Sequence, residues 1–163
     1  YLAAKKFNAQ TIIRVTGDNP LLDGEFLRKQ FENYLQQNNN ERTYLSTTLT
    51  QTYPLGMSIE IFSFNLLEEA YIKAEHPGEL EHVTPYMYQN KPGNIKIIKP
   101  KRNSTKYHYR LTVDTPDDFL LNKKLVEDFG CDSLKMEEII KVLDNHPELL
   151  QINKSSRQKK WYE

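Results

Sequence analysis

Apolar and polar residues follow two periods along this chain, and segments of the two kinds alternate. Alternating or continuous β-branched runs predict strands at residues 10–16, 42–48, 57–63, 94–100 and 107–113. Apolar residues three and four positions apart predict helices at residues 1–8, 24–37, 65–75, 79–89, 116–128 and 134–143. This order predicts an α/β sandwich with a mixed, largely parallel sheet, in which the regions 42–63 and 94–113 add antiparallel pairing.

Two helix starts carry strong local signals. Asp23 is expected to cap the helix over 24–37. Thr115 is expected to cap the helix that begins at Pro116, where proline fits the first helical position and the acidic residues that follow complement the helix dipole. Gly130 marks the end of that helix.

Composition narrows the class of protein without identifying it. The 163 residues suffice for one domain, which we assign to residues 1–153, with a basic flexible tail at 154–163. The 22 basic residues balance the 22 acidic ones, so nothing in the charge calls for a nucleic acid or an anionic membrane as partner. Cys131 is the single cysteine, which excludes an internal disulfide and indicates a reducing, cytoplasmic location. No apolar run approaches the roughly 18 residues of a membrane helix.

The candidate chemistry centres on two aspartates. Asp18 and Asp114 each follow a hydrophobic run that predicts a strand, and each is followed two positions later by proline. Both are therefore expected at the carboxyl ends of strands, where open α/β sheets bind ligands. If the two strands are neighbours, the carboxylates converge and could share one Mg²⁺ beside phosphate groups. The alternative is that each aspartate only precedes a turn or a capped helix.

Further polar residues lie in two other segments. Glu60 sits in the middle of the predicted strand 57–63, opposite the apolar face formed by Met57, Ile59 and Ile61, so it faces either solvent or a polar pocket. Glu81, His82 and Thr84 could bind sugar hydroxyls or a carboxylate, or could simply cap a helix. Walker, dinucleotide-binding and nucleophile-elbow motifs are absent from the sequence.

Four stretches occur together in the order and spacing of one family: RVTGDNPLLD, TYPLGMSIEIFS, LEHVTPYMY and LTVDTPDDF. In these the chain resembles the spore-coat polysaccharide cytidylyltransferase-like proteins, which belong to the wider group of CMP-sugar-acid synthetases. The resemblance extends to about Asn153. It implies a Rossmann-like, glycosyltransferase-A-type nucleotidyltransferase fold, which uses CTP and Mg²⁺ to make a CMP-sugar and pyrophosphate, in an enzyme that commonly forms homodimers.

The resemblance also implies roles for particular residues. Asp18 and Asp114 match the family's metal-binding aspartates, which makes them the candidate catalytic residues. Glu60, Glu81, His82 and Thr84 match motifs on the sugar side of the site. Arg110 is a further candidate for substrate binding, because strand alternation places it on the same face as Asp114, although it could equally face solvent.

One departure from the family is large. The family opens with a strand and a basic, glycine-containing loop that binds the triphosphate, and this sequence has no such loop. The chain is therefore expected to be N-terminally incomplete and inactive alone, as the C-terminal part of a cytidylyltransferase. Two alternatives stay open at this point. One is a glycosyltransferase that consumes a nucleotide-sugar, and the other is a non-catalytic fragment or assembly module.

Overall fold

A computed structural model describes residues 1–38, 42–103 and 108–158. Four short strands form one sheet, in the order β1–β3–β2–β4. Their bounds are β1 Thr11–Arg14, β2 Thr43–Ser46, β3 Glu60–Ser63 and β4 Lys96–Ile98. The β2–β4 pair is parallel, whereas β3 runs antiparallel to both of its neighbours. The predicted mixed sheet is confirmed, but two of its three strand pairs are antiparallel, because β3 runs opposite to the other three strands.

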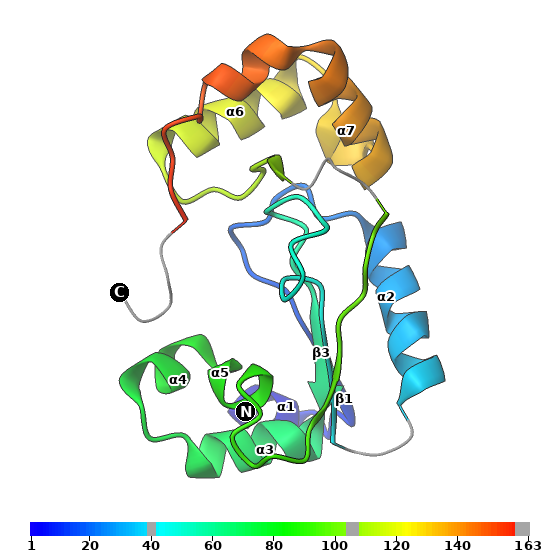
Figure 1. The fold of residues 1–163 in the computed structure, drawn as a ribbon, viewed down its shortest axis with the longest axis vertical. Coiled ribbons are helices and arrows are strands. Elements are labelled where there is room, and N and C mark those ends of the chain that lie inside the picture. The colour runs from blue at the N-terminus through cyan, green and yellow to red at the C-terminus, as the bar shows by residue number, and fades with distance from the viewer. Residues whose placement is uncertain (39–41, 104–107, 159–163) are drawn as a thin grey trace.

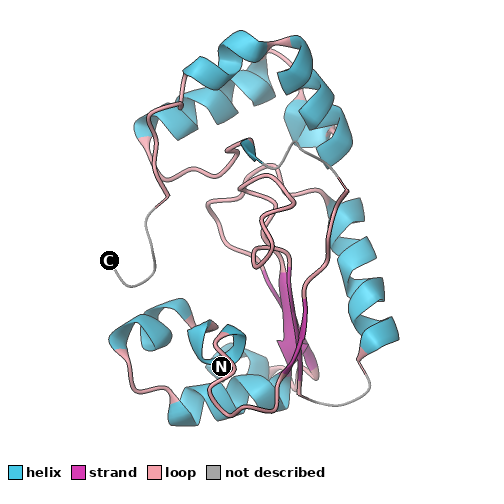
Figure 2. Cartoon of the chain, in the orientation of Figure 1, coloured by secondary structure: helices cyan, strands magenta, loops and turns pink. Residues whose placement is uncertain are grey.

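Helices surround this sheet and extend the molecule at both ends (Figure 1). The α-helices are α1 Leu2–Lys6, α2 Gly24–Gln37, α3 Phe64–Lys73, α4 Pro77–His82, α5 Pro85–Tyr88, α6 Pro116–Glu127 and α7 Met136–Asn145. Two 3₁₀ turns, η2 Cys131–Ser133 and η3 Pro147–Gln151, flank α7. Helices α3, α4 and α5 gather at one end of the long axis, α6 and α7 lie at the other, and α2 runs alongside the strands (Figure 2). No helix in the described ranges is long and apolar enough to cross a membrane.

The predicted helix caps form as expected. The Asp23 side chain accepts hydrogen bonds from the backbone N–H groups of Glu25 and Phe26 at the start of α2. Thr115 and Asp118 form a reciprocal capping box at the start of α6. Each cap satisfies backbone donors that the first helical turn leaves without a partner, so these helices begin where the sequence predicts.

Strand alternation divides the apolar side chains between two cores. Leu45 and Ile61, which face each other across β2 and β3, pack in one core with side chains of α2, α6 and α7. Tyr44 and Phe62, also cross-strand partners, pack in the second core with side chains of α3 and α5. The predicted apolar face of the strand over 57–63 is therefore confirmed, and Glu60 lies on the opposite face with Phe62.

Three predicted elements differ from the structure. The strand predicted over 107–113 is wrong for its described part, residues 108–113, where a single isolated bridge joins Arg110 to Leu55. The single helix predicted over 79–89 is wrong, because Val83 takes a positive φ of 67° and divides the segment into α4 and α5. The first strand is half-buried rather than buried, because β1 lies at one end of the sheet order. The proposed division into residues 1–153 and 154–163 stays a prediction, and residues 159–163 lie outside the described part.

Candidate functional site

The segments that carry the two candidate aspartates run side by side. The backbone N–H of Val113 donates a 2.8 Å hydrogen bond to the carbonyl oxygen of Asp18. The Thr112 hydroxyl donates to the same carbonyl oxygen at 3.1 Å and to Asp18 Oδ2 at 3.3 Å. Asp114 directly follows Val113. Asp18 and Asp114, which are 96 positions apart in sequence, therefore belong to adjacent segments. That the two carboxylates share one ion stays a prediction.

One atom of Asp18 fits a role in binding a cation. Its Oδ1 is buried and has no hydrogen-bond partner among the described residues. Burying a carboxylate oxygen without a partner is costly, and a bound cation would remove that cost. No cluster of three or more histidine, cysteine or acidic side chains in the described ranges could hold a metal by itself. Mg²⁺ is commonly held by one or two carboxylates together with substrate phosphates, so these residues fit an ion that binds with a nucleotide.

Arg110 is buried and pairs with acidic side chains of its own chain. Its Nε and Nη2 donate to the two carboxylate oxygens of Asp118, both at 2.9 Å, and Nη2 also donates to Asp114 Oδ2 at 2.6 Å. Its Nη1 donates to Gln158 Oε1 at 2.8 Å. The alternative of a solvent-facing Arg110 is therefore wrong. The buried guanidinium therefore holds the Asp114 carboxylate in place. That Arg110 also contacts the substrate stays a prediction.

Three of the predicted sugar-side residues line one pocket of about 290 Å³. Its walls are Arg14, Thr16, Thr48, Ser58, Glu60, His82, Thr84, Tyr88 and Gln158. Glu60 comes from β3, whereas His82 and Thr84 lie at the break between α4 and α5. Thr16 lies two positions before Asp18, so the pocket adjoins the aspartate loop. Five of these nine side chains carry a hydroxyl group, and His82 and Gln158 add an imidazole and an amide. These donors and acceptors suit a polyhydroxylated ligand.

The Glu60 carboxylate is held from two sides. Arg14, its direct partner across β1 and β3, forms a short ion pair with Oε2. The Tyr44 hydroxyl forms a short hydrogen bond with Oε1. Burial raises the pKa of Tyr44 well above its ordinary value, and the neighbouring Glu60 charge raises it further, so Tyr44 stays a neutral donor. Sequence patterns do not indicate Arg14 or Tyr44 as site residues, because their contacts depend on strand register.

The other predicted site residues lie outside this pocket. Glu81 is exposed on α4 and is not among the pocket residues. Neither Asp18, Asp114 nor Arg110 lines it directly, although Arg110 contacts the pocket residue Gln158. The structure thus brings Glu60, His82 and Thr84 together and leaves Glu81 apart from them.

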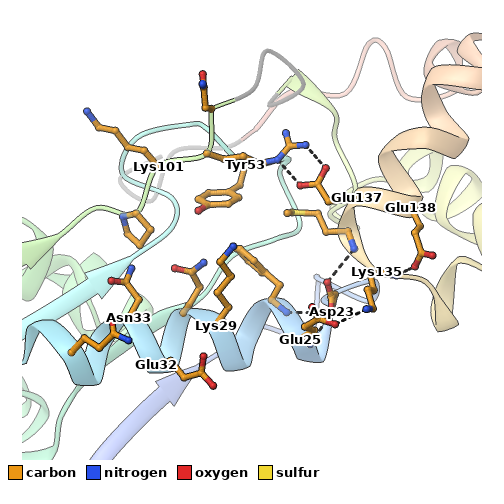
Figure 3. Close-up of a pocket in the computed structure, with 17 residues that line it drawn as sticks. Asp23, Glu25, Lys29, Glu32, Asn33, Tyr53, Lys101, Lys135, Glu137 and Glu138 are labelled. Carbon is orange, nitrogen blue, oxygen red and sulfur yellow. Dashed lines mark hydrogen bonds and ion pairs between the residues drawn. The ribbon is translucent and has the colours of Figure 1, made fainter.

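A larger pocket, of about 850 Å³, lies elsewhere, between α2, the start of α7 and the loops around Tyr53 and Lys101 (Figure 3). Figure 3 shows basic and acidic side chains interleaved along it, with Lys29 and Glu32 on α2 and Lys135 and Glu138 near α7. None of the residues predicted for substrate or metal binding lines this pocket. We therefore take the smaller pocket, which brings Glu60, His82 and Thr84 together, as the candidate site.

Comparisons with known proteins agree on one family. The family model described as cytidylyltransferase matches residues 1–160. The Methanocaldococcus jannaschii protein MJ1063 is 39% identical over 165 residues. The Bacillus subtilis spore coat polysaccharide biosynthesis protein SpsF is 31% identical over 141 residues, which cover 84% of this chain. A solved cytidylyltransferase from Leptospira borgpetersenii superposes on 97% of the chain with a TM-score of 0.80 and 30% identity.

The chain is shorter than all three of these proteins. It covers 65% of MJ1063, 56% of SpsF and 64% of the solved cytidylyltransferase chain. The TM-score and coverage of the solved structure agree with the Rossmann-like nucleotidyltransferase fold that the sequence motifs imply.

Proposed function

Because this chain belongs to the cytidylyltransferase family, we propose that the protein transfers CMP from CTP to a hydroxyl group of a sugar acid or related sugar, in surface polysaccharide biosynthesis. The sugar oxygen would form a bond to the α-phosphorus of CTP. The bond from that phosphorus to the oxygen it shares with the β-phosphate would break, pyrophosphate would leave, and the hydroxyl proton would be released.

The observation that carries this proposal is the convergence of two motifs that are separate in sequence. Glu60 comes from one motif and His82 and Thr84 from another, yet all three line one pocket next to the loop of Asp18. A pocket rich in hydroxyl groups suits a sugar. A buried aspartate oxygen that has no partner among the described residues suits the ion that accompanies a triphosphate.

Different residues would bind the metal nucleotide and the acceptor sugar. Asp18 and Asp114 would hold Mg²⁺, which would neutralise charge on the phosphates. Glu60, fixed by Arg14 and Tyr44, would accept hydrogen bonds from sugar hydroxyls and so orient the sugar. Holding the attacking hydroxyl in one orientation removes much of the entropic cost of bringing two substrates together.

The proposal is tested by measuring pyrophosphate release by the full-length protein with CTP and MgCl₂, using N-acetylneuraminate and 3-deoxy-manno-octulosonate as acceptor probes. We expect release that requires CTP, Mg²⁺ and an acceptor, with a CMP-sugar identified by mass spectrometry. Transfer of a sugar from a nucleotide-sugar would instead support the glycosyltransferase alternative. Absence of both activities would support a non-catalytic module and overturn the proposal.

We also propose, from the family resemblance, a cytoplasmic homodimer. Light scattering of the purified full-length protein checks the mass in solution, and a monomer at micromolar concentration would contradict this part. The light-scattering result is independent of the pyrophosphate assay, so the proposed homodimer and the proposed CMP transfer are tested separately.

A further inference from the structure

The segment from Asn153 to Gln158 contacts residues next to the candidate metal ligand Asp114 and also reaches the candidate pocket. Asn153 is buried, and its Nδ2 donates to Asp118 Oδ1 at 2.8 Å and to the carbonyl oxygen of Arg110 at 3.1 Å. Three residues on, the Ser156 hydroxyl shares a 2.8 Å hydrogen bond with that of Thr115, directly after Asp114. These contacts fix where the segment runs.

Gln158 is the member of this segment that lines the candidate pocket. Its Oε1 accepts a 2.8 Å hydrogen bond from Arg110 Nη1. A guanidinium has donors only, so the amide must turn its oxygen toward Arg110, and its NH₂ group is the end left for another partner. The contact therefore settles which end of the amide is available.

We propose that Gln158 binds the acceptor sugar by donating a hydrogen bond from its amide NH₂ group, and that Arg110 is the positioning residue that holds this amide. The inference rests on the proposed function and adds a binding residue to its acceptor pocket. Oxygen atoms of the sugar accept the bond, whereas Glu60 in the same pocket accepts hydrogen bonds from the sugar's hydroxyl groups. A pocket that offers both a donor and an acceptor fixes the orientation of a polyhydroxylated ring.

Arg110 joins the two halves of the site in this arrangement. One guanidinium contacts Asp114 on the metal side and Gln158 on the acceptor side, while Asp118 anchors it in the core. The Arg110 side chain therefore contacts a residue of each half of the site.

Two variants of Gln158 separate binding from a merely structural role. Gln158→Ala removes both the amide NH₂ and the contact with Arg110. Gln158→Glu keeps an oxygen for Arg110 but has no hydrogen to donate to the sugar. Gln151→Ala is the matched control, because Gln151 is exposed in the preceding turn and lies outside the pocket.

The measurements are kcat and KM of the full-length protein for each acceptor probe and for CTP. We expect both Gln158 variants to raise the acceptor KM by about five- to tenfold, the size of one lost hydrogen bond, with the KM for CTP within about twofold of wild type. Gln151→Ala should match wild type in both. Calorimetric titration of the acceptor probe in the presence of CMP should show a similar increase in Kd.

Two results would overturn the inference while leaving the proposed function intact. One is an active wild type in which Gln158→Ala leaves the acceptor KM unchanged. The other is a Gln158→Glu variant that behaves as wild type, which would show that the residue only holds Arg110. A wild type that releases no pyrophosphate with any probe would instead overturn the proposed function, and this inference with it.

Discussion

Arg110 and Asp118 form a buried ion pair in which two guanidinium nitrogens each lie 2.9 Å from a different carboxylate oxygen. Asp118 is fully buried and also accepts hydrogen bonds from Asn153 and from the backbone N–H groups of Asp114 and Thr115. The loop that carries the candidate metal ligand Asp114 is thus held by hydrogen bonds to the buried Asp118 carboxylate. The geometry of this loop depends on Asp118 being ionised.

Acid should therefore destabilise the protein in a defined range of pH. Burial raises the pKa of Asp118, but hydrogen bonds from Arg110 and Asn153 outweigh it and lower the pKa to about 2, from an ordinary value of 3.8. A hydrogen bond from Arg42 lowers the pKa of Glu69 to about 2, from 4.5. Both folded pKa values lie below the unfolded ones, so the stabilisation is complete above pH 4.5 and is lost as the pH falls toward 2.

Urea unfolding at a series of pH values checks this prediction. The free energy of unfolding should fall steadily from pH 4.5 to pH 2 in the wild type, and less steeply in Asp118→Asn and Glu69→Gln. Equal slopes in all three proteins would show that other groups are responsible for the acid sensitivity.

Removing the charge of Arg110 should be strongly destabilising. Arg110→Met leaves Asp118 buried without its cationic partner, and breaking a buried ion pair in this way costs about 3–5 kcal/mol. The measurement is the free energy of unfolding at neutral pH. Lys124→Met is a suitable control, because the ion pair of Lys124 with Asp128 is largely exposed and its loss should cost no more than about 1 kcal/mol. Similar losses in the two variants would contradict the buried role of Arg110.

Asp18→Asn and Asp114→Asn should each abolish Mg²⁺-dependent pyrophosphate release by the full-length protein and leave it folded. An asparagine fills nearly the same space but lacks the charge that holds the ion. Activity is measured together with circular dichroism and the thermal midpoint Tm. Asp117→Asn, which changes an exposed aspartate in the first turn of α6 outside the proposed site, is the control and should keep wild-type turnover. Near-normal turnover in either aspartate variant would remove that residue from the proposed metal site.

Tyr44→Phe should weaken acceptor binding without affecting CTP. The substitution keeps the ring in the core but removes the hydroxyl that holds Glu60 Oε1. A hydrogen bond to a charged group contributes about 1.5–3 kcal/mol, so the acceptor KM should rise at least tenfold. Tyr71→Phe, on the exposed side of α3, provides the comparison. An unchanged acceptor KM would show that Arg14 alone suffices to hold Glu60.

Gly56 is expected to tolerate no side chain. It has a φ of +99°, and a Cβ there would lie 2.7 Å from the carbonyl carbon of Leu111 and 2.8 Å from the backbone nitrogen of Thr112. Gly56→Ala should cost about 1–3 kcal/mol for the strained backbone alone, with a further cost from displacing the segment next to Asp18. Thermal unfolding measures this effect. Gly17→Ala, where a Cβ would meet nothing within 4 Å, is the comparison for steric contact and should cost less.

The sequence by itself determined most of the local structure and the family. The helix over 24–37 forms with the predicted bounds, because Asp23 caps it and its apolar residues recur at helical spacing. The alternation around Glu60 correctly divided the two faces of β3. Such features follow from neighbouring residues, through backbone hydrogen bonds and side-chain direction, so a one-dimensional pattern is enough to predict them.

The partners of the site residues were decided only by the tertiary structure. Arg14 and Tyr44 reach Glu60 through the register of three strands, and Gln158 reaches the pocket through the buried Arg110. The segment around Arg110 does not form the predicted strand, because only an isolated bridge to Leu55 forms in its described part. The side-chain contacts of Arg14, Tyr44 and Gln158 join residues from 16 to 48 positions apart. These contacts form because the strand register that packs both cores at once has the lowest free energy. A local sequence pattern does not contain that information.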